Sequence, residues 1–391
     1  MLKLQTAGES HGQALVAILS GLPAGLPVDV AYVKRELQRR QGGYGRGGRM
    51  KIETDTAQFL AGVRHGQTIG SPIAIFIENR DWENWKETLA VDQAPESEAK
   101  ARPMASPRPG HADLAGCLKY NLHDARFVLE RASARDTAAR VAAGALAKLF
   151  LKQFGIEVAS HIIALGSVAL DVLPVPFERV LALRNLEEVV LNCVDPKVEA
   201  RMMEEVDRAI EARDTVGGTF EVIARGVPPG LGSYAQWDER LDGLLAQAVM
   251  SIPSVKAVEL GEGIAGSGSP GSAVHDEIGY DAAQRHFTRK SNRAGGLEGG
   301  VSNGEDIVVR GYVKPISTLR RPLESVTLES KESVKAAYER SDVCAVPAAG
   351  VVGEAMVAFV LARAFLEKFG GDSLPETRRN FDGYIQQLRE Y

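Results

Sequence analysis

The sequence predicts a globular α+β protein, and both its composition and its apolar patterns indicate this fold class. The chain has 391 residues, of which 45% are hydrophobic and 25% are charged, as is typical of a protein with a packed core. Short strand-like segments alternate with helix-like segments along the chain. The length admits two or three domains, or one large domain with a sizeable core.

Five segments have the apolar content expected of strands, and they are residues 14–19, 72–79, 219–225, 255–260 and 307–313. The first helix is predicted to begin after Asp29, which can cap it, and to run to about Gln41. Val30, Val33 and Leu37 share the apolar face of this helix, and two glycines stop it.

Three further helices follow from the same kind of periodicity. Residues 137–154 form an alanine-rich helix that Gly155 closes. Residues 198–210 carry apolar side chains spaced by four, and the last helix, about residues 376–390, is amphipathic. The polar, proline-containing residues 81–109 are expected to form a long surface loop.

Two alanine-rich segments are similar to each other. Residues 147–155 read AKLFLKQFG and residues 362–370 read ARAFLEKFG, and a polar entry precedes each helix, at residues 131–133 and 340–342. This similarity is consistent with a fold of two similar halves. Ordinary C-capping explains it equally well, because alanine-rich helices commonly end at a glycine.

Charge and cysteine content argue against several classes of protein. The formal net charge of −5 counts against a general nucleic-acid binder, which usually carries a basic balance. The cysteines are far apart and lack CxxC spacing, so we expect no disulfide framework, no metal site and a reducing, cytoplasmic compartment. The N-terminus has no apolar signal peptide, and residues 351–365 are judged too short and too charged to span a membrane.

Three motifs suggest functions that their sequence context does not support. Residues 8–12 (GESHG) fit the GxSxG nucleophile elbow, which would make Ser10 the nucleophile of a serine hydrolase. Such an elbow joins a strand to a helix, whereas a strand-like segment follows Ser10. Residues 43–48 and 261–266 fit GxGxxG, but neither stands between a strand and a convincing helix, as a dinucleotide-binding turn requires.

The first candidate binding segment spans residues 39–51, which contain five glycines and no acidic residue. Its basic residues are Arg39, Arg40, Arg46, Arg49 and Lys51. Arginine binds phosphate and carboxylate bidentately, and glycine lets backbone N–H groups approach an anion closely. The segment therefore predicts an anion site, and the alternatives are a solvated basic loop or an RNA-contacting patch.

Four other segments combine charged or hydroxyl groups with turn residues. Residues 108–113 (RPGHAD) form a tight turn that would present an arginine and a histidine together. Residues 131–137 can cap the following helix and leave its N–H groups to an anion, with simple capping as the alternative. Residues 289–304 predict a glycine-rich binding loop, and Lys314 with the hydroxyls that follow it suits a phosphate. Residues 340–342 (RSD) supply a carboxylate that could act as a base or cap a helix.

Taken together, these segments resemble the chorismate synthase family. The resemblance rests on motifs that occur in that family's order and cover nearly the whole chain, at residues 8–12, 45–50, 108–113, 131–137, 291–296, 314–318 and 340–342. It implies a single domain over residues 1–391 with a β-α-β sandwich fold, usually assembled as a homotetramer. It also implies a lyase of the shikimate pathway, which converts 5-enolpyruvylshikimate 3-phosphate to chorismate and phosphate by 1,4-elimination with reduced FMN and no net redox change.

The resemblance also assigns roles to individual residues. The substrate-binding residues would be Arg40, Arg46, Arg49, Arg108 and Arg135. His11 would donate a proton to the departing phosphate, and His111 would protonate the reduced flavin. Asp342, with Ser10 and Ser133 nearby, would help to shuttle a proton at the flavin. The residues that fall where the family contacts FMN are Arg131, Ala132, Ser133, Pro253, Ser254, Gly299, Lys314, Pro315, Ile316, Ser317, Thr318 and Arg340.

An NADP site described for the family falls on Arg40 and Arg46, but the sequence has no convincing nicotinamide site. NADPH would therefore have no role other than that of a reductant. For the reduction of the flavin itself, we favour an outside reductant. Two rival functions are an RNA- or nucleotide-binding protein that uses residues 39–51 and a serine esterase built on Ser10. The acidic net charge and the aromatic content of 6% argue against the first of these rivals.

Overall fold

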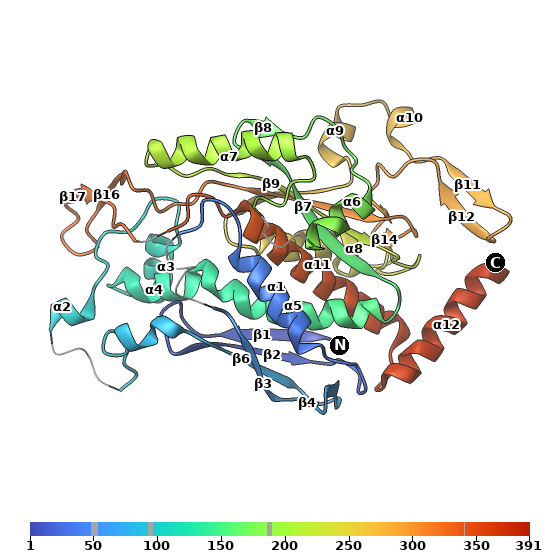
Figure 1. The fold of residues 1–391 in the computed structure, drawn as a ribbon, viewed down its shortest axis with the longest axis horizontal. Helices are drawn as coiled ribbons and strands as arrows, with labels where there is room; N and C mark the ends of the chain where they lie inside the picture. Colours follow the sequence, from blue (N-terminus) through green and yellow to red (C-terminus); the bar gives the residue numbers. More distant parts are fainter. Residues whose placement is uncertain (48–53, 93–96, 186–189, 340) are drawn as a thin grey trace.

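The computed structural model describes residues 1–47, 54–92, 97–185, 190–339 and 341–391, and the predicted α+β class is confirmed. Two antiparallel sheets, of four and five strands, form the framework. Long helices lie between these sheets. Figure 1 shows the four-stranded sheet below the helices and the five-stranded sheet above them.

The four-stranded sheet has the order β1-β2-β6-β3. Its strands are β1 (Lys3–Ala7), β2 (Ala14–Ser20), β3 (Ala57–Ala61) and β6 (Ile73–Glu78). Successive side chains of a strand point to opposite faces, so Leu15 and Leu19 of β2 and Ile75 of β6 are buried against the helices. The other face is open, and Ile18 on it is 36% exposed.

The five-stranded sheet has the order β10-β15-β9-β7-β8. Its strands are β7 (Glu157–Leu165), β8 (Val168–Ala169), β9 (Gly218–Arg225), β10 (Val255–Leu260) and β15 (Ile307–Val313). Phe220 and Val222 of β9 are buried and lie against a central helix at Gly353. Both sheets therefore turn an apolar face toward the same helical layer.

The central layer consists of α1 (Val30–Gln41), α5 (Thr137–Lys152) and α11 (Val346–Phe369). Helix α5 packs on β2 and β6, α11 packs on β7 and β9, and the two helices pack on each other. The two similar alanine-rich segments form the ends of these helices. Phe365 lies 5.6 Å from Phe150 and 4.4 Å from Phe154 between ring centroids, so the segments build one aromatic cluster.

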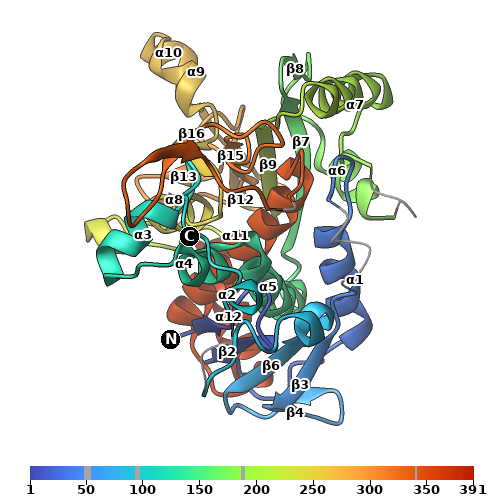
Figure 2. The ribbon, with the colours of Figure 1, turned by 90° about the vertical axis from the view of Figure 1, so that its left-hand side faces the viewer.

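The remaining elements surround this framework. The other α-helices are α2 (Glu98–Ala101), α3 (Asp113–Tyr120), α4 (Ala125–Ala132), α6 (Phe177–Ala182), α7 (Pro196–Glu211), α8 (Leu241–Met250), α9 (Gly263–Ser267), α10 (Gly271–Val274) and α12 (Leu374–Glu390). The short strands are β4 (Val63–Arg64), β5 (Gln67–Thr68), β11 (Ile278–Asp281), β12 (His286–Arg289), β13 (Leu297–Glu298), β14 (Val301–Ser302), β16 (Glu324–Val326) and β17 (Ser333–Lys335). Figure 2 looks onto the end of the molecule at which α3, α4 and β16 lie.

The predicted strands and helices are all present, with bounds that differ by a few residues. Asp29 caps α1 as predicted, because its side chain accepts the N–H of Tyr32 at 2.9 Å. Two apolar positions are wrong: Val30 is 51% and Ile210 is 37% exposed. Both residues lie in the terminal turn of their helix.

Helix α11 is longer than the sequence analysis allowed. It has 24 residues and by length and composition alone could cross a membrane, so the judgement that this segment is too short is wrong. In the structure, 83% of its most apolar window is buried inside the protein. The apolar surface of α11 is therefore used for packing between the sheets.

Residues 81–109, for which a long surface loop is expected, contain the short helix α2 and several buried side chains. Met104 packs with Ala125 and Leu129 of α4. Trp85 is also buried. Residues 93–96 of this segment lie outside the described residues.

Gly144 of α5 lies where α5 and α11 approach closely, because a Cβ atom there would be 2.4 Å from the Cβ of Ala355. Replacing Gly144 by alanine is expected to lower the free energy of unfolding by about 1–3 kcal/mol, since packed backbones must move apart. Urea denaturation measures this change. The control is Gly243→Ala, at an exposed position of α8 where a Cβ would meet no described atom within 4 Å. We expect this substitution to raise the free energy of unfolding by about 0.5–1 kcal/mol. Equal losses in the two variants would contradict the packing argument.

Candidate active site

The loop between β1 and β2, residues 8–13, carries Ser10 and His11. Asn79 holds this loop, because its side-chain amide donates to two of the loop's carbonyls at 3.1 and 2.7 Å. The Ser10 hydroxyl donates to the Ser133 hydroxyl at 3.0 Å. Two antiparallel strands flank the loop, so its GxSxG match is not the strand–turn–helix of a nucleophile elbow.

His11 is held on two sides. Its Nδ1 lies 2.9 Å from Oε1 of Glu130, and its backbone N–H donates to Oε2 of the same carboxylate at 2.8 Å. Its ring stacks on Trp85 with a centroid distance of 4.1 Å and an interplanar angle of 24°. Because Nδ1 faces Glu130, a proton exchanged with a ligand would pass through Nε2.

Glu130 lies in α4 and is buried. Burial raises the pKa of Glu130, but the hydrogen bonds and charge of His11 and the charge of Arg126 outweigh it, so this pKa is below its ordinary value. Arg126 in turn donates to Glu339 at 2.6 Å. Glu130 is therefore a charged acceptor for His11 at neutral pH.

Asp55 joins two of the predicted substrate-binding arginines. Arg40 donates to its carboxylate at 3.1 Å, and Arg135 donates to the other oxygen and, at 2.9 Å, to Asn79. Burial lowers the pKa of Arg40, Asp55 raises it, and the charges of Arg135 and Arg46 lower it, so that this pKa falls to about 10. No acceptor among the described residues reaches the buried Nε of Arg40, so an anionic ligand would complement this group.

Arg46 lies in the loop after α1 and pairs with Asp342, which precedes α11, at 2.6 Å. The N–H of Gly47 donates to the same carboxylate at 2.7 Å, and the N–H of Val343 donates to the Gly45 carbonyl at 2.8 Å. These bonds join two predicted motifs that are almost 300 residues apart in the chain.

Arg39 does not join this group of arginines. Its guanidinium donates to Glu36 at 3.0 Å and to Glu354 at 2.9 and 2.7 Å, inside the core. Neighbouring helix residues point about 100° apart, so Arg39 faces α11 while Arg40 faces Asp55. The Arg40 side chain is buried and the Arg39 side chain is only 12% exposed, so the alternative of an exposed basic patch is wrong for them.

The turn at residues 108–113 presents Arg108 and His111 together, as predicted. Arg108 donates to Asp113 at 2.8 and 3.1 Å and to Thr318 at 2.8 Å. His111 Nδ1 lies 2.5 Å from Asp113 and 3.0 Å from Arg108. The carboxylate contact requires a proton on Nδ1, and because a guanidinium only donates, the approach of Arg108 to this protonated nitrogen is then not a hydrogen bond. Burial raises the pKa of Asp113, but hydrogen bonds from His111 and Arg108 outweigh it and lower that pKa.

One of the predicted FMN segments, residues 314–318, contacts this turn, and a second segment contacts the first. The Lys314 ammonium donates to the Gly110 carbonyl at 3.0 Å, and the Lys314 N–H donates to the Ser254 carbonyl at 2.8 Å. Burial lowers the pKa of Lys314. Lys314 therefore contacts the residue before His111 and also contacts Ser254, although the three segments are far apart in the sequence.

The other predicted FMN residues have different surroundings. Arg131 donates to Thr6, to the Gly8 carbonyl and to Asp136, beside the loop that carries His11. Ala132 ends α4, Ser133 caps the turn after it, Pro315 is exposed, and the Ile316 carbonyl accepts from Thr215.

Gly299 is the exception to this clustering. The carbonyl beside it, of Gly300, accepts the N–H of Leu241 at the start of α8, whereas Ser254 follows the end of that helix. A helix of this length separates the two ends by about 15 Å. Arg49 and Arg340, two further predicted site residues, lie outside the described residues.

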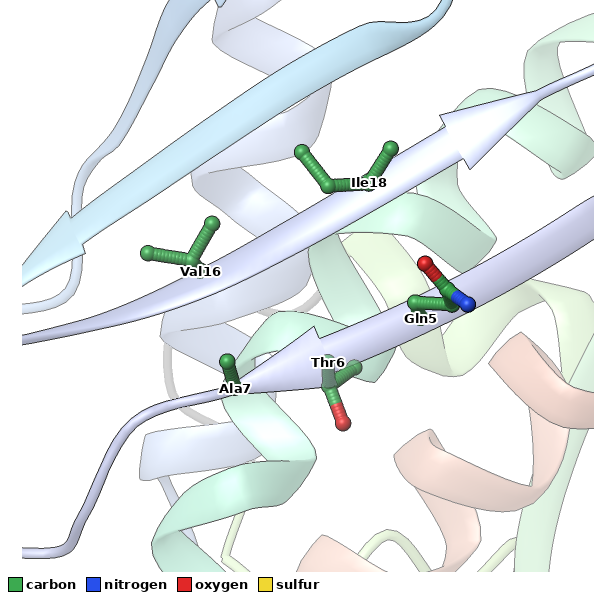
Figure 3. Close-up of a pocket in the computed structure, with 5 residues that line it drawn as sticks. All are labelled: Gln5, Thr6, Ala7, Val16 and Ile18. Atoms are coloured by element: carbon green, nitrogen blue, oxygen red, sulfur yellow. The ribbon is translucent and has the colours of Figure 1, made fainter.

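The predicted site residues that the structure describes, apart from Gly299, form three groups. They centre on His11, on Arg46 with Asp342, and on the turn of His111. Two surface hollows lie elsewhere: Figure 3 shows the one lined by Gln5, Thr6, Ala7, Val16 and Ile18 on the open face of β1 and β2. The other is lined by Ile210, Glu211, Arg213, Arg320 and Tyr338. No predicted site residue lines either hollow.

Sequence reasoning missed the partners of both histidines. Asp113 belongs to the recognised motif at residues 108–113, so its carboxylate beside a histidine was a usable signal. Glu130 directly precedes the motif at residues 131–137, but nothing in the sequence pairs it with His11. Trp85 lies in a polar segment and gave no signal. Within the described residues, no group of three or more histidine, cysteine or acidic side chains could hold a metal ion.

Buried arginines, two histidines paired with carboxylates and a hydroxyl pair are typical of an enzyme active site. The Chorismate synthase family profile matches residues 2–366. Chorismate synthases of Acidobacterium capsulatum and Koribacter versatilis are each 62% identical over the full length of both chains. A crystal structure of a chorismate synthase aligns with a TM-score of 0.79 at 41% identity and covers 100% of this chain and 99% of that one. The chain belongs to the chorismate synthase family and is accordingly a lyase of the shikimate pathway.

Proposed function

We propose that this chain converts 5-enolpyruvylshikimate 3-phosphate to chorismate and phosphate by 1,4-elimination. The observation that carries the proposal is the gathering of Arg40, Arg46 and Arg135, with a buried Arg40 Nε that no described acceptor reaches. The substrate has two carboxylates and a phosphate, which match arginine forks. Arg49 and Arg108 are proposed to complete the set that binds it.

Each histidine is proposed to act through Nε2, because a carboxylate occupies its Nδ1. His11 would donate a proton to the departing phosphate, which needs an acid to leave as a stable group. His111 would hold a proton beside the cofactor. The residues proposed to relay a proton between them and the cofactor are Ser10, Ser133 and Asp342. The hydrogen bond between the two serines supports this relay.

The residues proposed to hold reduced FMN fit an anionic cofactor. Lys314 lies beside the hydroxyl-bearing Ser317 and Thr318, and a Cβ atom at Gly110 would be 3.5 Å from both Lys314 Nζ and Ser317 Cβ. A lysine with adjacent hydroxyls suits a phosphate group. When bound, reduced FMN supplies electron density to the reacting ring without net redox change. The further residues proposed to contact FMN are Arg131, Ala132, Ser133, Pro253, Ser254, Gly299, Pro315, Ile316 and Arg340. NADPH is proposed only as a reductant.

We also propose one domain over residues 1–391, with a β-α-β sandwich fold of two similar halves. One apolar core supports the single domain, because it includes side chains of both sheets. The paired ends of α5 and α11 support the two similar halves. A cytoplasmic homotetramer is proposed. The open face of the four-stranded sheet, with Val16 and Ile18 in its hollow, offers apolar surface to a second copy of the chain (Figure 3).

The test is turnover of the phosphorylated substrate under anaerobic conditions, with chorismate and free phosphate measured together. Equal amounts of the two products are expected with reduced FMN. Neither is expected without flavin or with oxidised FMN. Activity without flavin would contradict the proposal, and phosphate release without chorismate would show simple hydrolysis instead of elimination.

A further inference from the structure

Glu130 contacts His11 through both carboxylate oxygens. Oε1 lies 2.9 Å from Nδ1, while Oε2 accepts the backbone N–H at 2.8 Å and lies 3.1 Å from Nδ1. The Glu130 carbonyl also accepts the N–H of Ser10 at 2.8 Å. One residue of α4 therefore fixes both the ring of His11 and the backbone that carries it.

Trp85 restrains the same ring from its face. The two rings are nearly parallel at 4.1 Å, and the Trp85 indole N–H donates to Asp81 at 3.0 Å, which keeps the indole in place. Stacking limits the plane of the His11 ring, and the carboxylate limits its rotation. Together they give Nε2 a single direction.

The charges around Glu130 come from several elements. His11 and Arg126 face its carboxylate, and Arg126 lies 3.6 Å from Oε1 while it donates to Glu339. Arg102 and Arg126 also stand over the Trp85 ring, at 4.4 and 5.2 Å. Exchanging Glu130 for glutamine would remove one negative charge from this buried group and keep its shape.

We infer that Glu130 is a positioning residue that orients His11 and keeps a proton on Nδ1, so that His11 acts through Nε2. The inference rests on the proposed role of His11 as the acid. In that step the Nε2–H bond breaks and an O–H bond forms on the departing phosphate. His11 is left neutral, with its Nδ1 proton still facing Glu130.

The test compares E130Q with E221Q. Glu221 forms a matched buried pair with His161, at 3.0 Å from Nε2, on the five-stranded sheet and outside the proposed site. We expect E130Q to lower kcat about 10–100-fold with little change in KM, as for carboxylates that orient metal-bound histidines. E221Q should keep the activity and pH profile of the original chain.

Nitrogen-15 NMR of the His11 ring supplies a readout that does not depend on activity. The Nδ1–H form is expected in the original chain, and the Nε2–H form is expected to become populated in E130Q. An unchanged tautomer together with unchanged kcat would overturn the role of Glu130. A changed tautomer with unchanged kcat would instead overturn His11 as the acid, and with it the proposed catalytic step. Should E130Q fail to fold, E130D is compared with E221D instead: the shorter side chain draws the carboxylate away from Nδ1 of His11, so kcat is expected to fall in E130D alone, and an unchanged kcat would overturn the role of Glu130.

Discussion

Replacing Glu354 by alanine is expected to lower the free energy of unfolding by about 3–5 kcal/mol, because the buried Lys148 and the mostly buried Arg39 and Arg184 lose a shared carboxylate. Arg39 donates to it at 2.9 and 2.7 Å, Lys148 at 2.5 Å and Arg184 at 2.8 Å. Ser160 donates to it from both its N–H and its hydroxyl. Urea denaturation followed by circular dichroism measures the change.

The cost of this substitution is expected to depend on pH. Burial raises the pKa of Glu354, but the charges of Arg39, Lys148 and Arg184 outweigh it and hold that pKa well below its ordinary value. A carboxyl group with a lowered folded-state pKa stabilises the fold above its unfolded-state pKa and loses this contribution as the pH falls. Glu354→Ala should therefore cost less at about pH 3 than at about pH 7.

The control lies on the same helix. Glu367 of α11 pairs with Arg363 at 2.9 Å on the surface, so Glu367→Ala is expected to change the free energy of unfolding by less than about 0.5 kcal/mol. If both variants lost a similar amount of the free energy of unfolding, the ion pairs of Glu354 would contribute nothing to stability beyond the difference in helix propensity.

Replacing His11 by asparagine is expected to lower kcat about 10²–10⁴-fold, because the acid that would protonate the departing phosphate is lost. The asparagine amide reaches the position of Nδ1 and can still donate to Glu130, so the loop should keep its conformation. The loss should therefore fall on kcat more than on KM. Steady-state kinetics with reduced FMN measures both constants.

His286→Asn is the matched control for this variant, since His286 is exposed on β12. It is expected to keep the original kcat, and the thermal unfolding temperatures of both variants should stay close to that of the original chain. A His11→Asn enzyme with near-original kcat would remove His11 from the mechanism.

Helix α1 shows how much of the candidate site could be predicted from the sequence. Its start at Asp29, its end near Gln41 and its basic C-terminal turn could all be predicted, because capping and periodicity are local properties. The acceptors to which its two neighbouring arginines donate could not be predicted. Arg39 pairs with Glu354, 315 residues away, while Arg40 pairs with Asp55, and only the packing of α1 between α11 and the loop before β3 makes that division.

The catalytic motifs show the same limit. The turn at residues 108–113 could be predicted to present Arg108 and His111 together, because proline and glycine fix the turn locally. The sequence did not show that Lys314 would contact this turn, or that Gly299 would lie at the far end of α8 from Ser254. Antiparallel strands joined by long connections set those distances.

By itself, the sequence determined where strands and helices form, which residues cap them and to which family the chain belongs, because each of these depends on neighbouring residues or on ordered motifs. Only the tertiary structure decided the acceptor of each buried charge. A carboxylate in α4 faces a histidine in a hairpin loop 119 residues earlier, and a carboxylate in α11 faces cations of α1 and α5. Burying an unpaired charge is costly, so charges that are far apart in the sequence must pair in the folded core. No local sequence pattern predicts which of these pairs will form.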